Sequence, residues 1–156
     1  MLQDRLPPFS MAEARAAVEA ALGGKLEDHF VEFGPLVAAA SIAQVHKAVV
    51  IDANGNRRTV AVKILRPGVE KSFKRDLDSY YFAARLAERL HAASRRLKPV
   101  AVVDTLKRTT ELEMDLRLEA AAISEMADNT RDEAGFRVPE VDWKRTSKRV
   151  LTLEWI

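Results

Sequence analysis

A run of small side chains is the first feature of this chain that could do chemistry. Lys63 then closes a later run of alternating apolar residues, Val60–Ala61–Val62–Lys63. Methyl and hydroxymethyl side chains let backbone N–H groups approach phosphate oxygens, and a strand lysine adds a point charge. The two features together predict a cradle for nucleotide phosphates. The residues of the small-residue loop are Ala38, Ala39, Ala40, Ser41, Ile42, Ala43 and Gln44.

A second chemical feature is a carboxylate on an otherwise apolar helical stripe. Burying the ionised Glu119 without a cation would cost on the order of several kcal/mol, so the pattern predicts an ion pair with Lys63. The alternative is that Glu119 lies at the edge of the stripe and reaches water. Asp115 precedes Glu119 by one helical turn on nearly the same face, whereas Glu113 is turned away, and both are open to solvation. The stripe consists of Leu112, Leu116, Glu119, Ile123 and Met126.

Composition excludes several classes of site. The chain has no cysteine, which excludes disulfides and thiolate metal sites, and its three histidines are too scattered for a metal-ligand motif. With 156 residues, 47% of them hydrophobic, the chain suits one domain with a real core. No apolar run approaches the roughly 20 residues that cross a bilayer, and no targeting segment is visible. We therefore expect a soluble globular chain.

One basic cluster lies before Pro99, where the sequence predicts the basic end of a helix and a linker that leaves it at the proline. The formal net charge is only +2, so any role with anions depends on such local clustering. A solvated helix end is the simpler interpretation, and contact with phosphate or lipid is the alternative. No aromatic residue is interleaved, which weakens a single-stranded nucleic-acid role. The cluster comprises Arg89, His91, Arg95, Arg96 and Lys98.

The elements that must hold the small-residue loop and Lys63 follow from local patterns. A capping box of Ser10 and Glu13 predicts a helix over Met11–Leu22. Apolar and β-branched runs between residues 30 and 51 predict two strands around the loop. Asn54–Gly55 predicts a tight hairpin turn with positive φ values, leading into a third strand. On that strand, Val60, Val62 and Ile64 face one side and Ala61, Lys63 and Leu65 the other.

Helical periodicity dominates the second half of the chain. A long amphipathic helix is predicted from Val69, a second helical region over Val102–Met126, and two short strands over Phe136–Trp143 and Val150–Trp155. This order predicts an α+β fold, a small antiparallel sheet with helices segregated to one side, as in a protein-kinase N-terminal lobe. The stripe of the first long helix is Val69, Phe73, Leu77, Tyr80, Ala84 and Ala87.

Three segments carry a resemblance to a known family. Residues 38–48, Val60–Lys63 and residues 113–121 follow one another in an order and spacing that resemble the UbiB (ADCK) family of atypical, protein-kinase-like proteins. The first and third motifs are specific to that family, and the match covers nearly the whole chain. In this family an alanine-rich loop stands where ordinary protein kinases carry a glycine-rich loop.

The resemblance implies roles for individual residues. Lys63 would contact the α- and β-phosphates of ATP or ADP and would be held by Glu119, which makes these two the implied catalytic residues. The loop from Ala38 to Gln44 would cover the triphosphate. Because alanine allows fewer backbone conformations than glycine, we expect an altered nucleotide preference.

Further positions follow from the same resemblance. Ala61 would line the nucleotide site, and backbone groups near Glu154 and Ile156, on a hinge strand, would meet the adenine. Glu113 and Asp115 would form the E-x-D motif, which in the family helps an N-terminal extension cover the active site where a protein substrate would otherwise dock.

Two departures from the family pattern limit what we expect of this chain. The K-x-G-Q motif, expected just upstream of Leu2, is missing. The chain stops at Ile156, before any catalytic-loop aspartate, its companion asparagine or the aspartate that binds magnesium. We therefore expect residues 1–156 to be a partial kinase-like domain, the N-lobe up to the hinge, without its C-lobe and without phosphoryl transfer of its own. Mg²⁺ would bind only the longer protein, through ligands outside this chain.

The resemblance implies that the longer protein is a kinase-like ATPase supporting biosynthesis of ubiquinone or another isoprenoid quinone or lipid, associated with a membrane such as the bacterial inner membrane. Its partners would be the nucleotide, its C-lobe, proteins of the quinone pathway and an anionic membrane surface, but not nucleic acid. An isolated lobe exposes apolar surface, so we expect self-association. The competing hypothesis is a non-enzymatic module whose long helices bind a partner or a membrane. A basic nucleic-acid binder is a third.

Overall fold

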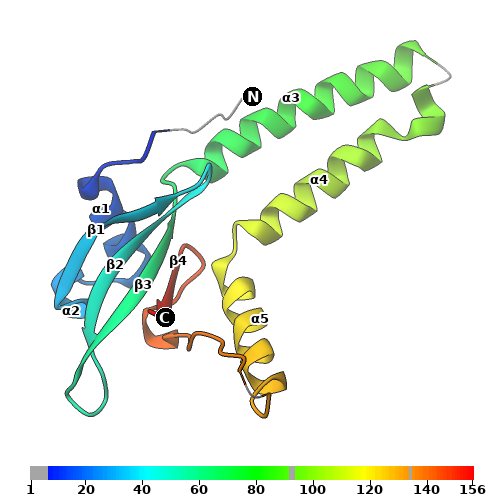
Figure 1. Ribbon diagram of the computed structural model, residues 1–156. Helices are drawn as coiled ribbons and strands as arrows, with labels where there is room; N and C mark the ends of the chain where they lie inside the picture. Colours follow the sequence, from blue (N-terminus) through cyan, green and yellow to red (C-terminus); the bar gives the residue numbers. More distant parts are fainter. Residues whose placement is uncertain (1–6, 92–93, 134) are drawn as a thin grey trace. The chain divides into compact units, whose positions relative to one another are not determined.

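The computed structural model describes residues 7–91, 94–133 and 135–156. It divides into two compact units, which we call the sheet unit (Met1–Pro67 with Asp115–Ile156) and the hairpin unit (Gly68–Met114). Figure 1 labels their elements. In chain order these are α1 (Met11–Leu22), α2 (Leu26–His29), β1 (Glu32–Ala39), β2 (Ala43–Ile51), β3 (Arg57–Leu65), α3 (Val69–Leu90), η1 (Ser94–Leu97), α4 (Pro99–Glu113), α5 (Leu116–Asn129), η2 (Trp143–Arg145) and β4 (Val150–Glu154).

The sheet unit is built on an antiparallel sheet of four strands in the order β1-β2-β3-β4. β2 and β3 pair without interruption from Ala43 opposite Leu65 to Ile51 opposite Arg57, whereas the β1–β2 register is irregular. The sheet and its helices confirm the predicted α+β, kinase-N-lobe-like fold class.

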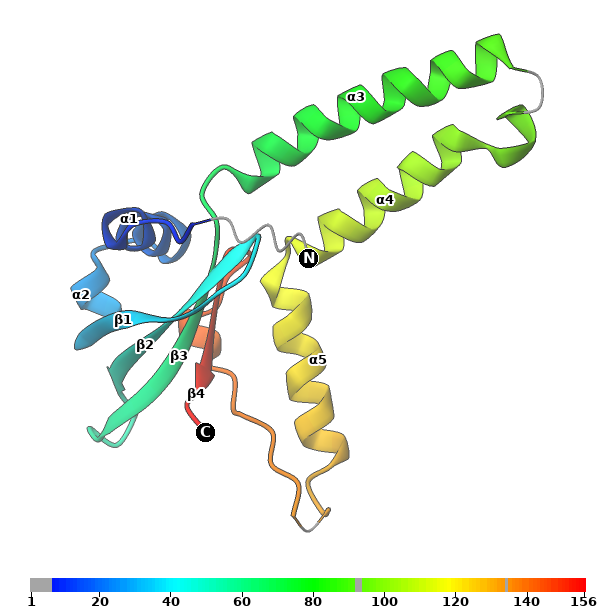
Figure 2. The ribbon, with the colours of Figure 1, turned by 45° about the horizontal axis from the view of Figure 1, so that its top comes forward.

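The two faces of this sheet have different partners. Val60, Val62 and Ile64 are fully buried in one core with Ala14 and Val18 of α1. Helix α1 begins and ends where predicted, and both bonds of the Ser10–Glu13 capping box form. Figure 2 shows α1 and α2 on one side of the sheet and α5 on the other, so the prediction that the helices are segregated to one side is wrong. Side chains that alternate with Val62 along β3 therefore face α5.

The predicted hairpin turn is wrong in its geometry. Gly55, with φ 83°, has a positive φ, but Asn54 does not. The connection is a longer loop in which the Asp52 carboxylate accepts hydrogen bonds from the backbone N–H groups of Asn54 and Asn56, at 2.8 and 2.9 Å. These two bonds, which lower the pKa of Asp52, replace the tight two-residue turn.

The single helical region predicted over Val102–Met126 is two helices. The first, α4, ends at Glu113, and α5 begins at Leu116. Asp115 interrupts the helical backbone because it is extended and caps α5, its carboxylate accepting from the Arg117 N–H at 3.1 Å. Of the predicted apolar stripe, Leu116 is buried, whereas Leu112 and Met126 are exposed on either side of the break.

Only one of the two predicted C-terminal strands forms among the described residues. Residues 136–143 make a single bridge, Val141 opposite Leu153, instead of a strand. Pro139 has no N–H to give to a ladder.

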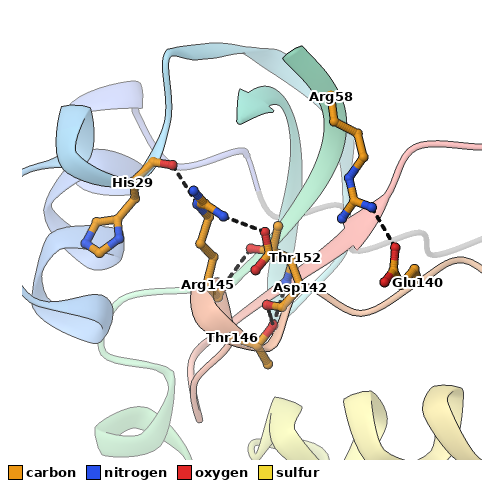
Figure 3. Close-up of polar contacts among 7 residues, drawn as sticks. All are labelled: His29, Arg58, Glu140, Asp142, Arg145, Thr146 and Thr152. Atoms are coloured by element: carbon orange, nitrogen blue, oxygen red, sulfur yellow. Dashed lines mark hydrogen bonds and ion pairs between the residues drawn. The ribbon is translucent and has the colours of Figure 1, made fainter. Parts of the chain in front are cut away.

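Two backbone bonds join this segment to β4, from the Asp142 N–H to the Thr152 carbonyl oxygen at 2.9 Å and from the Glu154 N–H to the Glu140 carbonyl oxygen at 2.8 Å. Polar side chains of the segment and of the residues that follow it add to these bonds (Figure 3). Arg145 forms an ion pair with Asp142 at 2.7 Å and donates to the His29 carbonyl oxygen at 2.6 Å. Thr152 donates to the Arg145 carbonyl oxygen at 2.7 Å. The segment is therefore tied both to the β4 strand and to the end of α2.

The hairpin unit has a small core of its own. Leu77 and Ala84 of α3 pack with Val103 of α4, and the Tyr81 hydroxyl donates to Asp104 at 2.6 Å. Tyr80, which was predicted to face inward, is exposed, because the stripe that faces α4 includes Tyr81 instead.

The predicted linker at Pro99 is also wrong. Pro99 is the first residue of α4, a position where its missing N–H is not needed. The basic cluster therefore extends from the last turn of α3, which contains Arg89, through η1, which contains Arg95 and Arg96.

Candidate functional site

The ion pair predicted between Lys63 and Glu119 is present. The Lys63 Nζ donates to both carboxylate oxygens of Glu119, at 2.9 and 2.7 Å. Lys63 lies on β3 and Glu119 in the first turn of α5, so the pair joins the sheet to the helix on the face opposite α1. The side chains remain 33% and 41% exposed. The lysine is thus held in place but still open to an incoming anion.

A shallow apolar surface lies beside this pair on the same face of the sheet. The strand registers align Val45 with Lys63 and Leu151, and Lys47 with Ala61 and Leu153. Val45, Ala61 and Leu153 are half-buried. Three small or aliphatic side chains in adjacent strands form a flat patch of the kind against which a planar ring packs.

The small-residue loop is shorter than predicted. Ala38 and Ala39 end β1, while Ala43 and Gln44 begin β2. The turn itself is Ala40–Ile42, which we call the alanine turn, closed by a 2.8 Å bond from the Ala40 N–H to the Ala43 carbonyl oxygen. Ser41 and Ala40 are exposed. It lies at the Lys63 end of the sheet, because Ala43 pairs with Leu65, two residues beyond Lys63.

Gln44 faces away from Lys63. It is opposite Ile64 in the register, on the α1 side, and its amide is fully used there. The side-chain oxygen accepts from the Phe9 N–H at 2.7 Å, and the side-chain nitrogen donates to the Phe9 carbonyl oxygen at 3.1 Å and to His46 Nε2 at 3.2 Å. The Gln44 side chain therefore points away from the predicted phosphate site, and only its backbone could help to cover a triphosphate.

His46 completes this buried polar chain. Its ring is 1% exposed, stacks on Phe33, and uses Nδ1 toward the Gly34 carbonyl oxygen at 3.3 Å. A neutral ring with the proton on Nδ1 satisfies both neighbours, since Nε2 can then accept from Gln44. No local signal in the sequence distinguishes the buried His46 from the exposed His91.

We expect a pH dependence of stability from His46. Burial lowers the pKa of His46 from its ordinary value of 6.5, with the Gly34 bond opposing the shift. The unfolded chain therefore takes up a proton near pH 6.5 that the folded chain refuses. Stability is full above that pH and falls, by at most about 1.4 kcal/mol per pH unit, as the pH drops below it.

Urea unfolding between pH 7.5 and 5.5 measures this effect. His46→Gln is expected to flatten the slope, and the matched change in an exposed histidine, His91→Gln, to leave it unchanged. An equal slope in wild-type protein and His46→Gln would show that other groups carry the dependence.

The two acidic residues of the predicted E-x-D motif have separate environments. Glu113 is the last residue of α4, in the hairpin unit. Asp115 belongs to the sheet unit, where Arg117 pairs with its carboxylate at 2.6 Å and lowers the pKa of Asp115. Asp115 is thus occupied within its own helix terminus, and the regulatory role of the motif stays a prediction.

The end of β4 carries the residues predicted to meet the adenine. The Glu154 N–H is already bonded to the Glu140 carbonyl oxygen at 2.8 Å, and its carboxylate to Arg137 at 2.5 Å. Trp155, which the sequence analysis did not single out, lies with its ring centroid 4.8 Å from Lys47 Nζ. The adenine contacts of Glu154 and Ile156 remain predictions. The backbone N–H of Glu154 is not free for such a contact, because it already donates to Glu140.

The described part of the chain has neither a metal-binding cluster nor a helix that could span a membrane. Within residues 7–91, 94–133 and 135–156, no three His, Asp or Glu side chains are grouped so that they could hold a metal ion. Nor does any described helix combine the length and apolarity needed to span a membrane. Leu2, beside which the K-x-G-Q motif was expected, lies outside the described residues.

Comparison with known proteins gives one consistent result. The family model of the ABC1 atypical kinase-like domain matches residues 1–156. A probable protein kinase UbiB of Marinobacter nauticus is 42% identical over 156 residues, 99% of this chain and 28% of that protein. The protein of the same name from Xanthomonas euvesicatoria is also 42% identical, and that from Xylella fastidiosa 39%. The chain thus spans little more than a quarter of the length of these relatives.

Proposed function

Because this chain belongs to the ABC1 atypical kinase-like family, we propose that it is a nucleotide-binding N-lobe. Lys63 receives the α- and β-phosphates of ATP or ADP, Glu119 holds Lys63, and the alanine turn lies over the phosphates. The half-buried surface of Val45, Ala61 and Leu153 receives the purine ring.

One observation carries this proposal. Lys63 is bonded to both oxygens of Glu119 and stays one-third exposed, beside a turn of small residues at the same end of the sheet. A lysine that only neutralised a buried carboxylate would itself be buried and closed to solvent. Here the charge is fixed in position yet accessible, as an anion site requires.

We propose further that the longer protein supports ubiquinone biosynthesis as a membrane-associated, kinase-like ATPase in which this chain is completed by a C-lobe. The support is the resemblance to UbiB proteins over the whole chain. The resemblance implies that magnesium would be held by the nucleotide and by groups outside this chain.

The test is thermal unfolding with ATP and ADP, with and without magnesium. At ligand concentrations about 100 times Kd, one site stabilises the folded state by about 2.7 kcal/mol. Lys63→Ala is expected to abolish this stabilisation, and Lys71→Ala, an exposed lysine of α3, to retain it. If neither this chain nor the full-length protein is stabilised, or if Lys63→Ala is stabilised as well as wild type, the proposal is wrong.

A second candidate function is favoured by the hairpin unit. Phe82 and Leu86 of α3 are 71% and 44% exposed and line one surface together with Arg85, Arg89 and Asp78. Exposed apolar side chains mixed with cations suit the interface of an anionic membrane. We propose that this surface attaches the protein to anionic lipid.

Vesicle flotation tests this attachment. Arg85→Gln with Arg89→Gln is expected to weaken binding to anionic vesicles by on the order of fivefold per charge. Arg75→Gln, an exposed arginine nearer the start of α3, is the matched control. Equal binding to neutral and anionic vesicles would contradict the role of the arginines, and no binding to either would remove this candidate.

A further inference from the structure

Arg66, the first residue after β3, makes two contacts with the alanine turn and a third with the segment that precedes α1. Its backbone N–H donates to the Ile42 carbonyl oxygen at 2.8 Å, and its Nε donates to the Ser41 carbonyl oxygen at 3.3 Å. Its Nη2 donates to the carbonyl oxygen of Pro7 at 2.9 Å. One guanidinium thus links the turn to the segment that precedes α1.

That segment is itself firmly anchored. Phe9 is 8% exposed and packs in the core with Val62 and Ile64, and the Gln44 amide holds both its N–H and its carbonyl oxygen. The Arg66 guanidinium carbon lies 5.4 Å from the centroid of the Phe9 ring. Arg66 therefore braces the turn against a fixed point on the face of the sheet opposite Lys63.

The turn has few means of holding its own shape. Its side chains, Ala40, Ser41 and Ile42, make no side-chain hydrogen bond that the structure records, so its conformation depends on backbone bonds. Two of its carbonyl oxygens, those of Ser41 and Ile42, are bonded to Arg66. Fixing a carbonyl fixes the plane of its peptide group, and with it the direction of the next N–H.

We propose that Arg66 is a positioning residue for phosphate binding. It holds the alanine turn in the shape in which backbone N–H groups face the phosphates, and it does so from behind, without touching the ligand. This inference rests on the proposed nucleotide function. It also distinguishes Arg66 from Lys63, because loss of Arg66 should affect only ligands that carry phosphates contacted by the turn.

Calorimetric titration with ATP and with adenosine tests this distinction. Arg66→Met keeps the aliphatic stem but loses the side-chain donors, and is expected to weaken ATP binding by about 5- to 10-fold, as the loss of one ordinary hydrogen bond does. Adenosine binding should change by less than about twofold, because adenosine has no phosphate for the alanine turn to contact and the purine surface is formed by residues outside that turn. Arg57→Met is the matched control, since Arg57 lies at the other end of β3 and pairs with the exposed Glu32.

Arg66→Lys tests whether the hydrogen bonds of Arg66 or only its positive charge support ATP binding. Lysine keeps the positive charge but cannot donate to two separate carbonyl groups through a planar fork, so it should behave like Arg66→Met. Full ATP affinity in Arg66→Lys would show that charge alone matters and would overturn the inference. An equal loss of ATP and adenosine affinity in both variants would do so as well.

Hydrogen exchange of the unliganded protein provides a readout independent of the nucleotide. The amides of residues 40–43 should exchange faster in Arg66→Met and Arg66→Lys, and at the wild-type rate in Arg57→Met. Unchanged exchange in both Arg66 variants would show that the Arg66 side chain does not hold the alanine turn, and would overturn the inference even if ATP binds. If wild-type protein binds no ATP, the proposed function fails, and this exchange experiment still decides whether the brace exists. Arg66→Lys serves alone if Arg66→Met does not fold.

Discussion

Glu119→Gln is expected to weaken ATP binding by about 10- to 100-fold while the free energy of unfolding stays within about 1 kcal/mol of the wild-type value. Glutamine has nearly the same size as glutamate, so the packing of α5 is preserved. It carries no charge, however, and its amide nitrogen cannot accept from Lys63. The lysine then loses one of the two bonds, at 2.9 and 2.7 Å, that hold it in place.

The two expected effects differ in size because of where the pair lies. Lys63 and Glu119 are 33% and 41% exposed, and water competes for partly exposed charges, so the pair contributes little to folding. For ligand binding, the same pair fixes the Lys63 ammonium in a single place. A freed lysine has several rotamers and must be ordered again by the nucleotide, at a cost in affinity.

Calorimetric titration with ATP and urea unfolding measure the two effects on the same protein. Glu125→Gln removes an exposed glutamate from the same helix and is expected to change neither quantity. Wild-type or tighter ATP binding by Glu119→Gln would mean that Glu119 repels the phosphates instead of holding Lys63. A large loss of stability would mean that the carboxylate is mainly a structural anchor of α5.

Features that depend on neighbours in sequence were predictable. The capping box at Ser10 and Glu13 involves residues three apart, and α1 has the predicted bounds. The alternation along β3 places Val62 and Lys63 on opposite faces, as the pleat of any strand requires. The Lys63–Glu119 contact spans the fold, yet it was predictable because a carboxylate on an apolar stripe needs a cation.

Features decided by contacts distant in sequence were not predictable. Asp115 suits the exposed face of a long helix and the cap of a new one equally well, and only the packing of Leu116 decides for the cap. The inward direction of Gln44 depends on where β2 begins, since a shift of one residue moves every side chain to the other face. Arg145 bonds a carbonyl group of His29, 116 residues away, and no local pattern contains that information.

The largest loss of stability is expected from breaking the Arg145–Asp142 pair. The side chains are only 11% and 10% exposed and lie 2.7 Å apart. Asp142→Ala leaves the Arg145 charge buried without its carboxylate, and removing one partner of a buried pair typically costs about 3–5 kcal/mol. We expect a loss in this range for Asp142→Ala, measured by urea unfolding.

The double variant tests the physical reason for this loss. With Asp142→Ala and Arg145→Leu together, no charge is left buried, so the total loss should be clearly smaller than the sum of the two single losses. It should not reach zero, because Arg145 also donates to the His29 carbonyl oxygen at 2.6 Å and ties the segment before β4 to α2.

An exposed pair at the same spacing provides the control. Arg131 and Asp128 are three residues apart, as Arg145 and Asp142 are, but their side chains are 74% and 70% exposed. Asp128→Ala is therefore expected to leave the unfolding midpoint unchanged, since water screens the charge that remains. If Asp142→Ala costs no more than Asp128→Ala, the ion pair does not stabilise the segment before β4, which is then held by its other hydrogen bonds. Additive losses in the double variant would mean that the two side chains act independently, each through its other hydrogen bonds.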